Sequence, residues 1–190
     1  IDADEKVSIF KIDAKKVTIK NLVFKNAFSQ MGGEISNIGD VKFENCKFCN
    51  NVASELGGAI INDEKMIISD CEFENNSSGG VGGAIAATFT SDLHIIKSKF
   101  TKNSVNFDIY CPGIILPSDA QGFGGAIYNN GKLDISESEF MENNCGKNGG
   151  AMIVLPDSVI CIKKSLFKDN HAKVDGGVIH TMGDINISDS

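Results

Sequence analysis

Residues 124–143 read GGAIYNNGKLDISESEFMEN, and this stretch is one copy of a unit that recurs along the chain. A glycine doublet opens each copy, and an isoleucine or methionine follows it after one intervening residue. The doublets are Gly32-Gly33, Gly57-Gly58, Gly82-Gly83, Gly124-Gly125, Gly149-Gly150 and Gly176-Gly177. Their spacings of 25, 25, 42, 25 and 27 residues predict a solenoid, because a period in the twenties built from short apolar runs lets each repeat cover its neighbour's core.

The second half of the unit has the pattern of a β-strand. A phenylalanine precedes an asparagine by three residues in five copies: Phe48 and Asn51, Phe73 and Asn76, Phe100 and Asn103, Phe140 and Asn143, Phe167 and Asn170. Apolar residues stand five and seven positions before each phenylalanine, and a cysteine or serine stands two before it. This period of two predicts a strand with one face in the core. The polar positions alternate in sign from copy to copy, so stacked copies avoid like charges about 5 Å apart.

These patterns predict an all-β fold, a right-handed parallel β-helix of six to seven coils of about 25 residues. Neither a leucine-rich ladder nor a helical period of 3.6 is present. The doublets are expected where the backbone bends or packs closely against the next coil. The asparagine column is expected at a turn, in left-handed backbone, with each amide bonding the asparagine above and below. A direct role of this column in binding is the alternative.

The chain is interpreted as one domain, residues 1–190, cut from a longer repeat protein. Ile185, Ile187 and Ser190 fall on the core columns of a further coil, and polar capping residues of the kind that end a solenoid are not evident. The sequence has no apolar run long enough to span a membrane.

Six cysteines raise the question of disulfides. Cys46 and Cys71 occupy one inward column in adjacent coils, where Ser98 stands in the next. They are interpreted as buried free thiols, with a Cys46–Cys71 bridge as the alternative. No metal site is predicted, since cysteine and histidine spacing matches no zinc pattern beyond the weak pair Cys46 and Cys49.

One interval breaks the period: 24 residues separate Phe100 from Gly124, where the other intervals are 8 or 9. The extra residues lie within an inserted loop, residues 104–123, which either packs on the coils or contacts a ligand. The ligand-binding candidates are six residues of this loop together with the nearby Tyr128. They are Asp108, Tyr110, Ile114, Ile115, Asp119, Phe123 and Tyr128.

Tyr128 belongs to a column that alternation places on the outside, formed by Ser36, Ile61, Ala86, Tyr128, Ile153 and His180. This column is partly apolar. It is expected either to be covered by the loop or a flanking segment, or to form an aliphatic face on which a protein could dock.

Composition argues against several activities. All 18 basic residues are lysines, so an arginine-based lyase mechanism is disfavoured, and most outward acids face a lysine in the next coil. His94, His171 and His180 lie in different columns and are interpreted as isolated surface residues. The net charge of −7 disfavours nucleic acid. No enzymatic activity and no cofactor are predicted, and a polysaccharide lyase or hydrolase is the alternative.

The units GGAIIN, GGAIYNNGKLDISESEF and FMENN resemble the repeats of the chlamydial polymorphic outer-membrane proteins and of the adhesin-like proteins of methanogenic archaea. The archaeal resemblance is preferred slightly, on the Asn130-Gly131 turn and the absence of arginine. The resemblance implies an extracellular, surface-displayed adhesin with a β-helical stalk. Its partner would be a protein or glycan on another cell surface.

Overall fold

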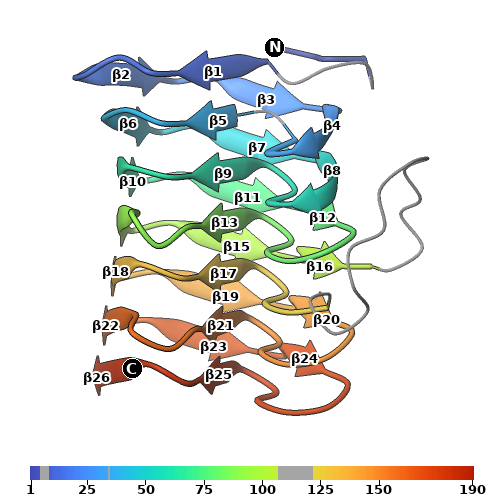
Figure 1. Cartoon of the computed structure of the whole chain (residues 1–190), viewed down its shortest axis with the longest axis vertical. Coiled ribbons are helices and arrows are strands. Elements are labelled where there is room, and N and C mark those ends of the chain that lie inside the picture. Colours follow the sequence, from blue (N-terminus) through green and yellow to red (C-terminus); the bar gives the residue numbers. More distant parts are fainter. Residues whose placement is uncertain (5–8, 34, 107–121) are drawn as a thin grey trace.

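The computed structural model describes residues 1–4, 9–33, 35–106 and 122–190, and in these residues it contains strands and turns but no helix. The strands form four parallel sheets, and successive coils add one strand to each (Figure 1). The parallel β-helix is therefore confirmed. No helix that could span a membrane occurs among the described residues.

We number the sheets by their order within a coil. Sheet 1 contains β1 (Phe10–Ile12), β5 (Ile35–Asn37), β9 (Ile60–Asn62), β13 (Ile85–Ala87), β17 (Ile127–Asn129), β21 (Met152–Val154) and β25 (Ile179–Thr181). Sheet 2 contains β2 (Val17–Lys20), β6 (Val41–Glu44), β10 (Lys65–Ser69), β14 (Asp92–Ile96), β18 (Lys132–Ser136), β22 (Val159–Lys163) and β26 (Asp184–Ser188).

Sheets 3 and 4 are built from shorter strands. Sheet 3 contains β3 (Val23–Lys25), β7 (Lys47–Cys49), β11 (Glu72–Glu74), β15 (Lys99–Thr101), β19 (Glu139–Met141) and β23 (Leu166–Lys168). Sheet 4 contains β4 (Phe28–Met31), β8 (Val52–Leu56), β12 (Ser77–Ser78), β16 (Ser104–Val105), β20 (Asn144–Cys145) and β24 (His171–Ala172).

The central core consists of columns of identical or similar side chains. Phe48, Phe73, Phe100 and Phe140 are fully or almost fully buried, and their rings stack in parallel, with centroids 4.6 Å apart between Phe73 and Phe100. This distance matches the spacing of neighbouring strands. The stacking is therefore a direct consequence of in-register pairing, in which Phe73 lies opposite Phe48 and Phe100.

The asparagine column forms the predicted ladder, but not in left-handed backbone. The Asn76 side-chain amide donates to Asn103 Oδ1 at 2.9 Å and to the Phe48 carbonyl at 3.0 Å, and the side chain is fully buried. The left-handed residue is the one before it, as at Asn75 (φ 53°) and Lys102 (φ 57°). The left-handed conformation was predicted for the asparagine itself, which is wrong by one residue. The residue before it makes the bend, and the asparagine side chain then points inward.

The inward column of cysteine and serine is a second ladder. The Cys71 backbone N–H donates to Ser98 Oγ at 3.1 Å, and the Cys46 N–H lies 3.4 Å from Cys71 Sγ. Both cysteines are free and buried. Burial raises the pKa of the Cys71 thiol to about 12. The structure thus has buried thiols in this column rather than a Cys46–Cys71 bridge.

The two glycines of each doublet have different roles. The first has positive φ, as at Gly57 (φ 61°). The second packs against the next coil, since a Cβ on Gly58 would overlap the Gly83 carbonyl oxygen and lie 2.5 Å from that of Ser77 in β12. The doublet therefore turns the chain between sheet 4 and sheet 1, as expected for a bend with a close approach.

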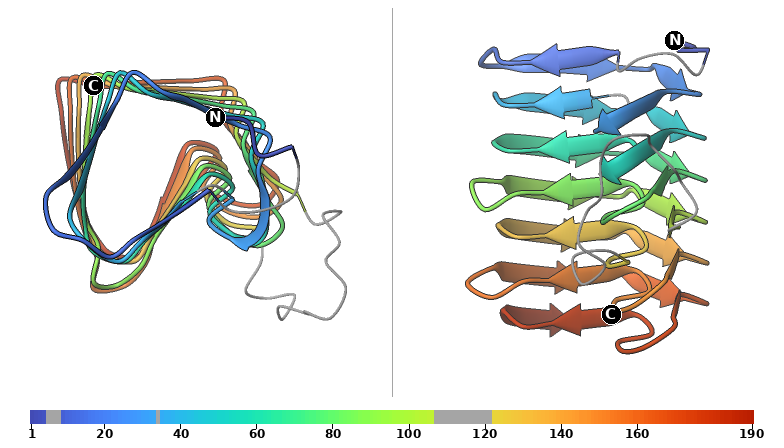
Figure 2. Two further views of the ribbon diagram at one scale, coloured as in Figure 1. Left: turned by 90° about the horizontal axis from the view of Figure 1, so that it is seen from above. Right: turned by 45° about the vertical axis from the view of Figure 1, so that its right-hand side comes forward.

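The expected outward aliphatic face is mostly covered. Ile61 is 7% exposed and Ile153 is 1% exposed, although neither belongs to the central core. Seen along the stack, each coil has a broad lobe with a narrower hooked lobe beside it (Figure 2, left). The hook brings the doublets against the outer side of sheet 1, where a Cβ on Gly57 would lie 3.0 Å from the Ala86 nitrogen. Of the two alternatives for this column, cover by another part of the chain therefore holds at Ile61 and Ile153, and the alternative of an open docking face was wrong there.

Surface charges follow the predicted alternation in sheet 3. Lys47 lies 3.4 Å from Glu72 and 2.6 Å from Glu74, and Lys99 lies 3.5 Å from Glu139. Hydrogen bonding to Lys47 lowers the pKa of Glu74. These pairs are solvated, so they set the register more than they stabilise the fold.

Candidate ligand-binding groove

The corner between sheets 1 and 2 is the irregular part of the described surface. The connection has two residues after β17 (130–131) and after β25 (182–183), but four residues after β13 (88–91) and after β21 (155–158). A short turn thus lies between two long ones in consecutive coils. The long turns project on either side of the short one, and the space between them forms a groove.

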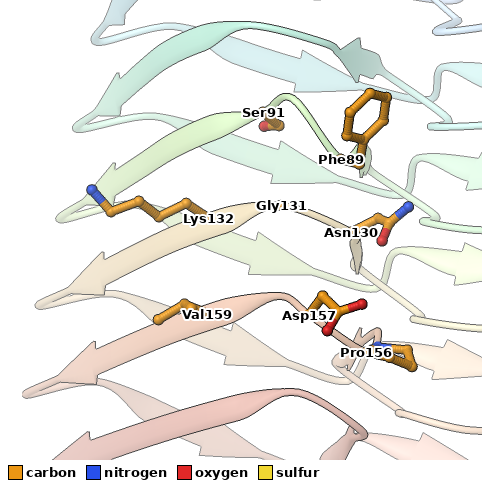
Figure 3. A pocket seen from close by; sticks show the side chains of 8 residues that line it. All are labelled: Phe89, Ser91, Asn130, Gly131, Lys132, Pro156, Asp157 and Val159. Atoms are coloured by element: carbon orange, nitrogen blue, oxygen red, sulfur yellow. The ribbon is translucent and has the colours of Figure 1, made fainter.

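The groove has a volume of about 540 Å³ and opens to solvent. Its walls come from the two long turns, with Phe89 on one side and Pro156 and Asp157 on the other (Figure 3). Phe89 is 78% exposed, in contrast to the buried rings of the central stack. The remaining lining is contributed by the short turn and the strands that follow: Ser91, Asn130, Gly131, Lys132 and Val159.

Gly131 lies in the short turn and lines the groove. A Cβ at this position would lie 2.6 Å from the carbonyl oxygens of both Ser91 and Thr88. The preceding Asn129 side chain is fully buried, and its amide donates to the Gly131 carbonyl at 2.9 Å. The short turn is thereby held close against the turn of the coil before it, which keeps the groove open.

Apolar and polar groups alternate around the groove. Phe89, Pro156 and Val159 supply apolar surface, while Asn130 offers an amide and Asp157 a carboxylate. The Lys132 ammonium is directed along the strand, 3.6 Å from Asp92 Oδ1 (Figure 3). A concave site with apolar walls and a few convergent polar groups is typical of small-molecule and saccharide recognition.

A charged cluster on sheet 2 adjoins the groove. His94 Nε2 lies 3.2 Å from Asp92 Oδ1, and His94 Nδ1 lies 3.3 Å from Asp134 Oδ2. The contact with Asp92 lacks the geometry of a hydrogen bond, since Asp92 Oδ1 has no hydrogen-bond partner. The interpretation of His94 as an isolated surface residue was wrong, because in-register pairing of β14 with β18 places Asp134 directly opposite it.

No group of three or more histidine, cysteine, aspartate or glutamate side chains within the described ranges could hold a metal ion.

The predicted site residues fall into two sets. Asp108, Tyr110, Ile114, Ile115 and Asp119 lie outside the described residues. The ends of the expected loop 104–123 belong to the coil stack, because Ser104 and Val105 form β16, and Phe123 bridges to Val81 of the preceding coil.

The two described candidates have separate environments. Phe123 precedes a doublet, and the Lys147 ammonium lies 5.1 Å from its ring centroid. Tyr128 is half-buried between Ala86 and Ile153 in sheet 1, and burial raises the pKa of its phenol. Neither side chain lines the groove.

The groove itself was not predicted, although the sequence contains its signal. The signal is the interval in sequence between the isoleucine or methionine that follows a doublet and the first core residue of sheet 2. This interval is six residues from Ile127 to Leu133. It is eight residues for Ile85 to Leu93 and for Met152 to Ile160. A short turn between two long ones in three consecutive coils predicts a groove at this corner.

The comparisons agree with this architecture. Residues 6–189 match the family described as right handed beta helix region. Since the match covers nearly the whole chain, the chain belongs to the right-handed β-helix family. No curated protein and no solved structure matches it.

Proposed function

We propose that this chain is a β-helical module of an extracellular, surface-displayed protein, and that it mediates attachment to a protein or glycan on another cell. The repeats that resemble those of adhesin-like proteins support this proposal, as does the β-helical architecture. The net charge of −7 argues against nucleic acid as the partner.

The observation that carries the proposal is the contrast between a uniform interior and an irregular exterior. Phenylalanine, asparagine and serine or cysteine columns continue from coil to coil with the same contacts. Departures from the period lie in the long turns 88–91 and 155–158, and in the longer stretch of sequence between β16 and β17. A solenoid of this kind is a rigid support that presents variable turns, which is how repeat proteins bind partners.

A polysaccharide lyase or hydrolase is the second candidate. Paired carboxylates are the chemistry it would need, and Asp92 and Asp134 both lie beside His94 on sheet 2. Their contacts with His94, and that of Asp92 with Lys132, are those of an ion-pair network. This pairing favours attachment over catalysis, because each carboxylate already has a cationic or hydrogen-bonding neighbour.

The test is a binding assay of the fluorescently labelled chain on intact bacterial, archaeal and mammalian cells and on an immobilised glycan panel. The same preparation is incubated with soluble polysaccharides to detect new reducing ends or unsaturated products. Saturable binding without turnover is expected, and heat-unfolded chain is the control. Turnover would favour the enzyme, and binding no stronger than that of the unfolded chain would contradict the attachment role.

A further inference from the structure

The groove between the turns 88–91 and 155–158 has the chemistry of a site for a neutral sugar. Phe89, Pro156 and Val159 give the groove its apolar lining, and the Phe89 ring is exposed at the edge of the groove, directed along the stack away from Asn130 (Figure 3). A pyranose ring has a face of C–H groups that packs on such surfaces, as aromatic side chains combine large contact area with defined geometry. Tryptophan often provides the aromatic surface on which a sugar packs, but this chain has none. Phe89 can take that role here.

Hydrogen-bonding groups are placed at the rim between the apolar walls. The Asn130 side chain, from the short turn, both donates and accepts, and the Asp157 carboxylate accepts (Figure 3). Asp157 has φ 64°, so its side chain is presented from left-handed backbone at the tip of its turn. Sugar hydroxyls donate and accept in the same way, so these groups can fix the orientation of a sugar unit that follows the one packed on Phe89.

The charge of the groove argues for a ligand without net charge. Lys132 and Asp157 are its charged lining residues, and their charges cancel. The Lys132 ammonium is also engaged with Asp92, so an anionic ligand finds no free cation among the lining residues. The net charge of −7 on the whole chain further opposes an anionic glycan.

We propose that this groove binds a neutral saccharide chain, with one sugar unit packed on Phe89 and a further unit hydrogen-bonded by Asn130 and Asp157. The inference rests on the proposed attachment role and names its ligand class and its site. Because the groove is open to solvent rather than closed, it suits a unit within or at the end of a glycan chain.

The test is titration of the isotopically labelled chain with neutral tetra- to hexasaccharides of glucose, xylose, mannose and galactose, followed by amide chemical shifts. Shifts are expected at Asn130, Gly131 and Lys132, and not in sheet 3. Phe89→Ala should weaken the affinity at least about fivefold, whereas Phe89→Tyr should retain it. Thr90→Ala, in the same exposed turn, is the matched control and should leave it unchanged.

Salt and charged probes separate a neutral sugar from other partners. Affinity should be the same in about 50 mM and about 500 mM salt, since a neutral ligand is not screened. Equal affinity of Phe89→Ala and the wild-type chain would overturn the proposal. So would binding only to oligogalacturonate or to a lysine-rich peptide, or no binding to any sugar at millimolar concentration.

Cell attachment of the same variants distinguishes this inference from the attachment role. If Phe89→Ala attaches to cells as well as the wild-type chain does, the groove proposal fails while the attachment role stands. If the wild-type chain binds sugars in the groove but attaches to no cell, the groove stands and the attachment role fails.

Discussion

At the residue scale, the stack depends on polar side chains that are buried but satisfied. Asn76 has no exposed surface, yet its amide bonds Asn103 and the Phe48 carbonyl, while its Oδ1 accepts from Asn51. Each asparagine thus joins its own coil to the coils on both sides. Burial of such groups is tolerated only because every hydrogen bond is made.

We expect Asn76→Ala to lower the free energy of unfolding by about 2 to 3 kcal/mol, because it removes the acceptor of the Asn51 backbone N–H and the side-chain donor to the Phe48 carbonyl. Lys99→Ala should cost under about 1 kcal/mol, since its ion pair is solvated. Urea denaturation midpoints measure both. Equal losses in the two variants would contradict the ladder's role.

The Cys71 thiol should be unreactive in the folded chain. Its pKa is raised to about 12 by burial, so the nucleophilic thiolate is scarce at pH 8. Alkylation followed by peptide mass spectrometry should label the half-buried Cys49 and Cys161 in the folded chain, and Cys71 only after denaturation. Rapid labelling of Cys71 without unfolding would contradict its buried position.

The raised pKa of the Cys71 thiol also makes the stability of the fold depend on pH. A thiol with a raised pKa in the folded state contributes stability below its unfolded pKa of about 9, and this contribution is lost as the pH rises towards about 12. Cys71→Ser should remove that loss and change stability at pH 7 by under about 1 kcal/mol. Serine occupies this column in later coils, where Ser138 accepts from the Ser98 N–H at 3.1 Å.

At the element scale, glycine doublets determine how coils connect. The second glycine of an inner doublet lies against the next coil, whereas a Cβ on Gly177 would meet nothing within 4 Å. The two positions have the same place in the repeat and differ only in what lies against them. They therefore form a matched pair for testing the close approach.

We expect Gly58→Ala to cost about 3 kcal/mol or more, because its Cβ would overlap backbone of Gly83 that cannot move without breaking the coil stack. Gly177→Ala should change stability by under about 1 kcal/mol. Thermal melting followed by circular dichroism measures the difference. A tolerated Gly58→Ala would show that the coils are spaced more widely than described.

Deletion of residues 107–121 should leave a folded β-helix. The Asn106 N–H donates to the Ser78 carbonyl and the Gly122 N–H to that of Gly80, so the two residues adjoin one connection of the preceding coil. Joining them leaves three residues, 106, 122 and 123, between β16 and the doublet, which is the length of residues 79–81 between β12 and its doublet. An unchanged circular dichroism spectrum and a melting temperature within a few degrees are expected, and an unfolded product would show that these residues stabilise the stack.

The sequence predicted the interior well because each column repeats. Phe73 and Phe100 each lie between two phenylalanines of adjacent coils. Five copies of one pattern therefore indicate where the strand lies, which of its faces is buried and how neighbouring strands are aligned. The groove was missed for the opposite reason. It depends on how three turns of different length lie side by side, and no single turn carries that information.

Cover over Ile61 and Ile153 was one of two alternatives that the sequence left open, and the segment that forms it was not identified. Alternation along one strand separates its two faces but does not say what lies beyond either face. Here the hook formed by sheet 4 and the doublets covers the outer face of sheet 1 (Figure 2). In the same way, His94 contacts Asp134 of the neighbouring strand as well as Asp92 of its own strand.

At the scale of the whole molecule, the account divides the chain into a scaffold and a binding surface. The scaffold consists of the four sheets and their buried columns. The binding surface is proposed at the turns that depart from the period. This division implies that binding and folding can be separated by substitution, since solvated turns contribute little to the stability of stacked coils.

The most direct test is cell attachment and thermal stability measured together for four proteins: wild type, Phe89→Ala, the deletion of 107–121, and Asn76→Ala. The account predicts that Phe89→Ala loses attachment at an unchanged melting temperature. It predicts that Asn76→Ala melts at a lower temperature but attaches normally while folded. Attachment that falls only in step with stability across all four proteins would contradict the division of scaffold from binding surface.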